Sequence, residues 1–242
     1  MKASTKRLQR IMAAVGLVVV LLITATTASA GNPGPNVLPP HSRPYGAGYG
    51  EWGARWWQWA LAQPASANPL VDEIGQFCNV DQHGPVWFLA GIAGAQGKVT
   101  RTCTIPFGKA IFFPVANNIY VLFPTDPNDT PLLARQTAAA AMKNLSELWA
   151  EVDGVPIRNL KDYQVISPDT KKPTTFPVKL PDDNILGVTP ANCPGLVCPA
   201  AAEGIQLMLA PLTPGQHVIK LHAGYAGGSP MDVTYNVTVG RR

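Results

Sequence analysis

Hydrophobic and polar residues alternate most strictly near the C-terminal end of the chain. From Met231 to Val239 every second residue is apolar, and the residues between them are polar. This period of two predicts a strand with one buried face and one solvent-exposed face. Further strands are expected in the other short apolar or alternating segments: Val86–Ala90, Lys98–Thr104, Ala110–Val115, Tyr163–Ser167, Ile205–Ala210 and His217–His222.

Two other segments have a helical period. Trp52, Trp56 and Trp59 recur at the i, i+4 and i+7 spacing, so residues 51–63 predict a short helix that Pro64 ends. Residues 131–150 carry apolar side chains without an interior Gly or Pro, after Thr130 as an N-cap. A second helix is therefore predicted over 131–150.

The strands outnumber the helices, and the fold class we expect is mainly β. The pattern predicts an antiparallel β-sandwich, of which a jelly roll is one version, with the two helices inserted. Residues 51–242 show no internal boundary and are expected to form a single domain. Residues 31–50, rich in Pro and Gly, predict an extended arm, and the Pro-rich stretch 168–204 predicts a long loop.

The first thirty residues differ from the rest of the chain. Four Lys or Arg residues precede the apolar run Ile11–Ala25, and small residues follow at Ala28-Ser29-Ala30. This order predicts a signal peptide over 1–30, cleaved before Gly31. An uncleaved membrane anchor is the alternative, but a helix that spans the bilayer needs roughly 20 apolar residues. We therefore expect a secreted or periplasmic protein with no membrane span after cleavage.

Removing this segment changes the charge of the chain. The formal net charge is +4, with 19 basic and 15 acidic residues. Residues 1–30 contain four of the basic residues and none of the acidic ones, so residues 31–242 carry 15 of each sign. A nucleic-acid partner is not expected, because binding to phosphates requires a surplus of cations.

An even number of cysteines in an exported chain predicts disulfides. Four cysteines allow three pairings, and the pairing between sequence neighbours joins Cys78 to Cys103 and Cys193 to Cys198. A zinc site is the alternative, but these cysteines lack the close spacing of zinc ligands.

The tryptophan-rich segment permits two interpretations. Trp52, Trp56, Trp57 and Trp59 could close one end of the β core, which is what a single helical stripe favours. They could instead form a platform on which sugar rings stack. We retain these four residues as candidate ligand-binding residues.

Acidic residues lie near the same segment, and paired carboxylates beside aromatic rings are typical of glycoside hydrolases. The candidate catalytic residues are Glu51, Asp72, Glu73 and Asp81. No Gly-x-Ser-x-Gly motif is present, and the four histidines are not at the spacing of a metal pair. No cofactor and no metal site is expected.

Several segments together resemble a family of uncharacterised secreted bacterial proteins. The resemblance covers most of the chain after residue 31, and the Trp-rich segment is its most specific part. It implies an exported, β-rich fold and no activity or functional residue. The segments that carry it are Tyr49–Ala60, Asn68–Leu70, Gly84–Gly91, Cys103–Pro114, Val152–Gly154 and Pro211–His217.

The functional prediction is an exported, non-catalytic β-sandwich that binds a small molecule or a glycan through aromatic side chains. One alternative is a secreted hydrolase that acts on polysaccharides through a carboxylate pair. A structural component of the cell envelope is the other.

Overall fold

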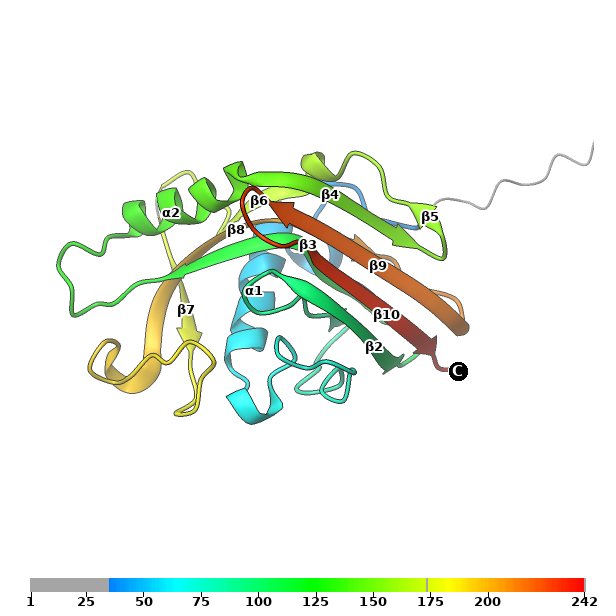
Figure 1. The fold of residues 1–242 in the computed structure, drawn as a ribbon, viewed down its shortest axis with the longest axis horizontal. Coiled ribbons are helices and arrows are strands. Elements are labelled where there is room, and N and C mark those ends of the chain that lie inside the picture. Colours follow the sequence, from blue (N-terminus) through cyan, green and yellow to red (C-terminus); the bar gives the residue numbers. More distant parts are fainter. Residues whose placement is uncertain (1–34, 173, 242) are drawn as a thin grey trace, which may run out of the picture. The chain divides into compact units, whose positions relative to one another are not determined.

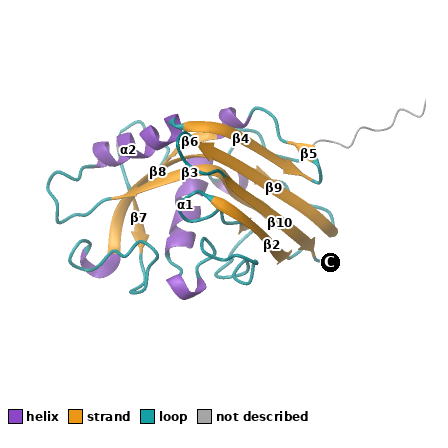
Figure 2. Cartoon of the chain, viewed as in Figure 1, coloured by secondary structure: helices purple, strands orange, loops and turns teal. Residues whose placement is uncertain are grey.

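The computed structural model describes residues 35–172 and 174–241. Residues Asn32–Arg242 form one compact unit, so the predicted domain and most of the predicted arm lie within it. The predicted signal peptide lies outside the described residues. The described part is mainly β, with ten strands in two mixed sheets and two α-helices (Figures 1 and 2). No helix in the described ranges is long and apolar enough to cross a membrane.

One sheet, sheet A, has the strand order β1-β3-β8-β6, and β7 also pairs with β8. The longest strand is β8, which pairs with β3 on one side and with β6 and β7 on the other. The bounds are β1 Val86–Phe88, β3 Ala110–Val121, β6 Gln164–Ser167, β7 Phe176–Lys179 and β8 Val197–Leu209.

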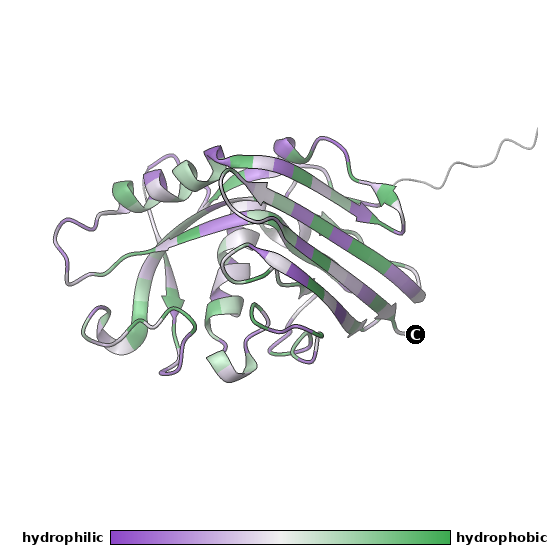
Figure 3. Cartoon of the chain, viewed as in Figure 1, coloured by the Kyte–Doolittle hydropathy of each residue, from purple (hydrophilic) through white to green (hydrophobic). Residues whose placement is uncertain are grey.

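The other sheet, sheet B, has the order β2-β10-β9-β4-β5. The alternation predicted for Met231–Val239 is confirmed, because buried and more exposed residues alternate along β10. Figure 3 shows the same alternation as bands along the strands of this sheet. The bounds are β2 Gly97–Ile105, β4 Leu145–Val152, β5 Val155–Pro156, β9 Gly215–Tyr225 and β10 Met231–Val239.

The pairing differs from the predicted antiparallel arrangement. β1 runs parallel to β3, and β2 runs parallel to β10, so each sheet contains one parallel pair. The reason is that a period of two fixes which face of a strand is buried but not the direction of its neighbour. Both sheets are therefore mixed.

Helix α1 (Tyr49–Leu61) confirms the first predicted helix, two residues earlier than expected. Its aromatic side chains cover one face of sheet A, where Tyr49 and Trp52 contact Phe112. The helix lies close to the sheet because it has a glycine there: a Cβ on Gly53 would lie 2.5 Å from Ser167 Oγ. The other face of sheet A, to which alternation assigns Phe113, faces sheet B, because β3 contacts β4 and β9.

The second predicted helix is correct at its start and wrong at its end. Helix α2 (Pro131–Lys143) begins with Thr130 as N-cap, whose Oγ1 accepts a hydrogen bond from Leu133 N at 3.2 Å. It ends at Lys143, and Leu145–Val152 forms β4 instead of a further helical turn. The physical reason is pairing, because β4 adds to the edge of β9 and buries Ala150 and Val152.

The predicted loop 168–204 is partly ordered into β7 and the first half of β8. Ala200, Ala201 and Ala202 favour a strand only weakly by themselves, but β3 pairs with this stretch on one side. Short 3₁₀ turns complete the structure at Pro44–Gly46, Ala65–Ala67, Leu160–Tyr163 and Pro194–Leu196.

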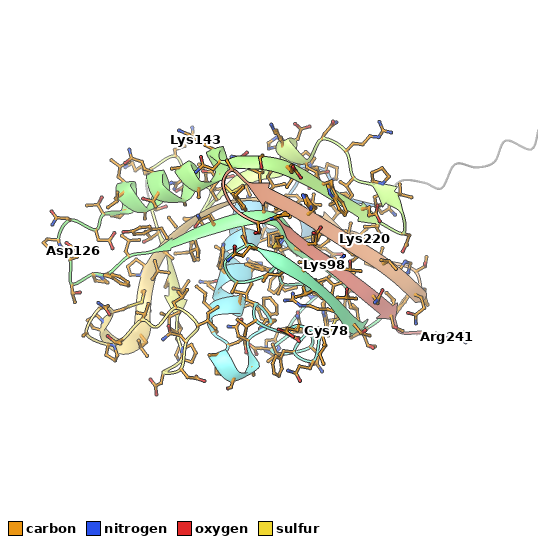
Figure 4. All side chains as sticks on the ribbon, in the orientation of Figure 1. Cys78, Lys98, Asp126, Lys143, Lys220 and Arg241 are labelled. Carbon is orange, nitrogen blue, oxygen red and sulfur yellow. A yellow bond between two sulfur atoms is a disulfide. The ribbon has the colours of Figure 1, made fainter. Side chains whose placement is uncertain are left out.

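Both predicted disulfides are confirmed. Cys78 bonds to Cys103 on β2, and Cys193 bonds to Cys198 on β8. Figure 4 labels Cys78 beside the edge of sheet B. Two disulfides fit an extracellular or periplasmic location.

Candidate functional site

An apolar cavity of about 480 Å³ lies beside β3. We call it the β3-edge cavity, and residues 116–119 of β3 form one of its walls. The other walls come from α1 through Trp57 and Leu61, from residues 91–96, from residues 185–186, from the end of α2 and from the β9–β10 turn. Segments far apart in the sequence therefore meet here.

The cavity exists because β1 is much shorter than β3. β1 pairs only with Ala110–Phe112, and the chain then turns away into residues 91–96. Beyond this point the edge of β3 that faces away from β8 has no neighbouring strand among the described residues. The cavity starts at Ala116, where the pairing with β1 has ended.

The lining is uncharged. None of the residues that line the cavity is Asp, Glu, Lys, Arg or His. Its polar members are amides and hydroxyls, among them Asn117, Asn144 and Tyr225, and burial raises the pKa of the Tyr225 hydroxyl. Such a site does not attract an ion, because transfer of a charge into an unpaired, poorly hydrated site is unfavourable.

Two buried N–H donors in the lining have no hydrogen-bond partner among the described residues. One is the Nε1 of Trp57, a residue that is 8% exposed, and the other is the Nδ2 of Asn117. A buried donor without a partner costs about 1–3 kcal/mol. Both nitrogens have almost no accessible surface, so they offer a ligand no contact in the cavity. The surface that the cavity offers to a ligand is therefore mainly apolar.

Among the four predicted tryptophans, only Trp57 lines this cavity. Trp52, Trp56 and Trp59 are buried, and each indole N–H donates to a backbone carbonyl at 2.9 Å. These carbonyls belong to Pro44, Leu89 and Val80, so the three rings fasten neighbouring segments to α1.

The four predicted carboxylates lie outside this cavity and have separate surroundings. Asp72 is buried and accepts hydrogen bonds from the backbone N–H groups of Ile74, Gly75 and Phe77. Asp81 lies 2.7 Å from His83 on the surface, and Glu73 is exposed.

Glu51 stabilises the start of α1. Its Oε2 accepts a hydrogen bond from Gly48 N at 2.7 Å and lies 2.9 Å from Arg43 Nη2. The bond from Gly48 lowers the pKa of the Glu51 carboxyl, and the positive charge of Arg43 lowers it further. A carboxylate at a helix N-terminus is also favoured by the helix dipole.

We expect Glu51→Gln to destabilise the protein by about 0.5 kcal/mol at pH 7, because this carboxylate is largely exposed and screened. A folded-state pKa that is lowered contributes stability above the ordinary pKa of about 4.3, and that contribution is lost as the pH falls. Urea midpoints of the two proteins should therefore differ at pH 7 and converge near pH 3. An equal difference at both pH values would contradict this role.

One buried side chain was not predicted from the sequence. Arg101 on β2 is 1% exposed, and its Nη1 donates to the carbonyls of Ala90 and Gly91 at 2.8 Å each and to Tyr235 Oη at 2.9 Å. Its Nε donates to Asp72 O at 2.7 Å. Arg101 therefore holds the start of the 91–96 wall against sheet B. Its place in the sequence was a signal, because it shares the inward face of β2 with Cys103 and Ile105.

Comparisons with known proteins identify no family. No protein-family model matches the chain, and no curated protein matches it. Two solved structures show weak similarity to this chain. The first is PbICP-C in complex with falcipain-2, which is 13% identical over 64% of this chain and 99% of that chain, with a TM-score of 0.27. The cysteine protease inhibitor EhICP2 from Entamoeba histolytica has 16% identity over 64% and 93% of the two chains and a TM-score of 0.21. At such TM-scores neither similarity bears on this protein's fold or function.

Proposed function

We propose that this chain is an exported, non-catalytic binding protein of the β-sandwich type, and that the β3-edge cavity takes a neutral, mainly apolar ligand. The observation that carries the proposal is the uncharged, mainly apolar lining of this cavity. The two disulfides and the predicted leader support export. The resemblance to uncharacterised secreted bacterial proteins agrees with it.

The lining restricts the chemistry of the ligand. A volume of about 480 Å³ lies within the usual range of ligand pockets, roughly 300–1,000 Å³. Apolar side chains such as Leu61, Ile92 and Met231 favour a ligand with apolar surface.

The same lining supports an apolar ligand more strongly than a glycan. A sugar presents many hydroxyl groups that need partners, whereas most of this surface offers none. The placement of the four carboxylates away from the cavity favours binding over glycoside hydrolysis, because that reaction needs two carboxylates across the bound sugar.

The proposal can be tested with N-phenyl-1-naphthylamine, a neutral apolar dye that fluoresces when bound. We expect the dye to bind the wild-type protein and to bind Ala141→Trp at least about tenfold more weakly, because a large side chain on the lining residue Ala141 fills the cavity. Fluorescence titration gives both affinities.

The matched control is Ala140→Trp, which places the same side chain on the exposed neighbouring position of α2, outside the lining. This variant should bind the dye as the wild type does. Equal binding by all three proteins would place the dye elsewhere, and no binding by the wild type would overturn the proposal.

A further inference from the structure

We infer that the occupant of the β3-edge cavity is an extended, uncharged segment of another polypeptide, which pairs with β3 as an added strand. This inference rests on the proposed function and names the class of its ligand. The supporting observations are the direction of the β3 backbone groups, the cover on other edges, and the chemistry of the lining.

The backbone of β3 presents unpaired groups toward the cavity. Leu122 N donates to Pro199 O of the segment that continues into β8, at 2.8 Å. In an antiparallel pair such bonds involve every second residue, so Tyr120 and Asn118 also face β8. The N–H and C=O groups of Asn117, Ile119 and Val121 then point to the opposite side. Among the described residues, no backbone hydrogen bond from another segment reaches these groups.

The corresponding edge of sheet B is covered. Thr102 N on the free edge of β2 donates to Ile74 O at 2.9 Å, and the Cys78–Cys103 disulfide fixes the same segment to this strand. Proteins usually cover or pair their strand edges, because an open edge is a template for another chain. The edge of β3 beside the cavity differs from that of β2, because no segment of the described residues covers it in the same way.

This edge already accepts a strand at its other end. β1 pairs in parallel with Ala110–Phe112 of β3, and Leu89 N donates to Phe112 O at 3.0 Å. An added segment beside residues 116–121 would continue the line that β1 begins. Six residues of strand span roughly 20 Å, enough for several main-chain hydrogen bonds.

The chemistry of the lining agrees with a peptide occupant. Alternate side chains of the added strand would point to the two sides of sheet A. One side presents Trp57 and Leu61 of α1, and the other presents the end of α2 and the β9–β10 turn. Since neither side is charged, we expect uncharged, mainly apolar side chains in the peptide.

The test uses a phage-displayed library of nine-residue peptides, selected on the wild-type protein and counter-selected on Ile119→Pro. Proline removes the outward N–H of Ile119 and is tolerated where that group faces away from the ladder. The matched control, Ile119→Ala, removes most of the side chain but keeps the N–H. We expect selected peptides to bind Ile119→Pro about tenfold more weakly than Ile119→Ala, which is the effect of losing a main-chain hydrogen bond in the complex.

Amide hydrogen exchange on the wild-type protein provides a second measurement, which does not depend on the folding of a variant. A bound peptide should slow exchange at Asn117, Ile119 and Val121, whereas a small apolar dye should leave these amides unprotected. Peptides that bind both position-119 variants equally, or a library that yields none, overturn the inference. If N-phenyl-1-naphthylamine still binds in that case, the proposed function stands; if neither binds, both fail.

Discussion

Replacement of Arg101 by methionine should destabilise the protein by about 2–4 kcal/mol. The guanidinium donates to three backbone carbonyls and to the Tyr235 hydroxyl, all of them buried. Methionine fills a similar volume but leaves the carbonyls of Asp72 and Gly91 without this donor, and each buried unsatisfied group costs about 1–3 kcal/mol. Ala90 O keeps its hydrogen bond from Tyr235 Oη at 2.9 Å. Removing a charge that is itself costly to bury offsets part of this loss. Urea denaturation of the two proteins measures the difference.

Lys98→Met is the matched control for this substitution, because it removes a cation from an exposed position on the same strand. Figure 4 labels Lys98 on β2. We expect a change of less than about 0.5 kcal/mol for this control. If Arg101→Met were as stable as Lys98→Met, the hydrogen bonds of Arg101 would contribute little to the stability of the protein.

Gly75→Ala should lower the free energy of unfolding by about 2–4 kcal/mol, because two separate costs add. Gly75 has a φ of +95°, a conformation that is costly for a residue with a side chain. A Cβ at this position would also lie 2.3 Å from Thr102 O, so the backbone of the 72–77 turn or of β2 would have to shift. The thermal midpoint and the urea midpoint should both fall.

Gly94→Ala separates these two contributions. Gly94 also has a positive φ, +78°, but a Cβ there meets no atom within 4 Å. We expect this control to lower the free energy of unfolding by only about 1 kcal/mol, which is the cost of the backbone conformation alone. Equal losses at both positions would show that the contact between the turn and β2 contributes little.

The sequence was most informative where a local pattern decides the structure. The alternation along β10, the stripe of tryptophans on α1 and the proximity of the paired cysteines each predicted an observed feature. Thr130 as N-cap also predicted the start of α2. Its end was missed because Leu145–Val152 becomes a strand only by pairing with β9, which follows much later in the sequence.

Such local sequence patterns could not predict the candidate site. The β3-edge cavity is the space that β1 leaves by ending early, and residues from distant parts of the chain surround it. No spacing in the sequence marks an edge without a partner. Trp57 was among the predicted binding residues, but its neighbours Trp52, Trp56 and Trp59 have the same residue type and different surroundings.

The parallel pairing of β2 with β10 has a consequence for the order of folding. Gly97 lies opposite Met231, so β2 obtains its strand partner only after nearly all of the described chain has been synthesised. Strand pairs this distant in sequence slow folding, because the entropy cost of closing the intervening loop comes before the pair forms any stabilising contact. Before β10 has been synthesised, β2 and its Arg101 have no partner strand with which to form a sheet. We therefore expect the nascent chain to remain unassembled in this region during synthesis.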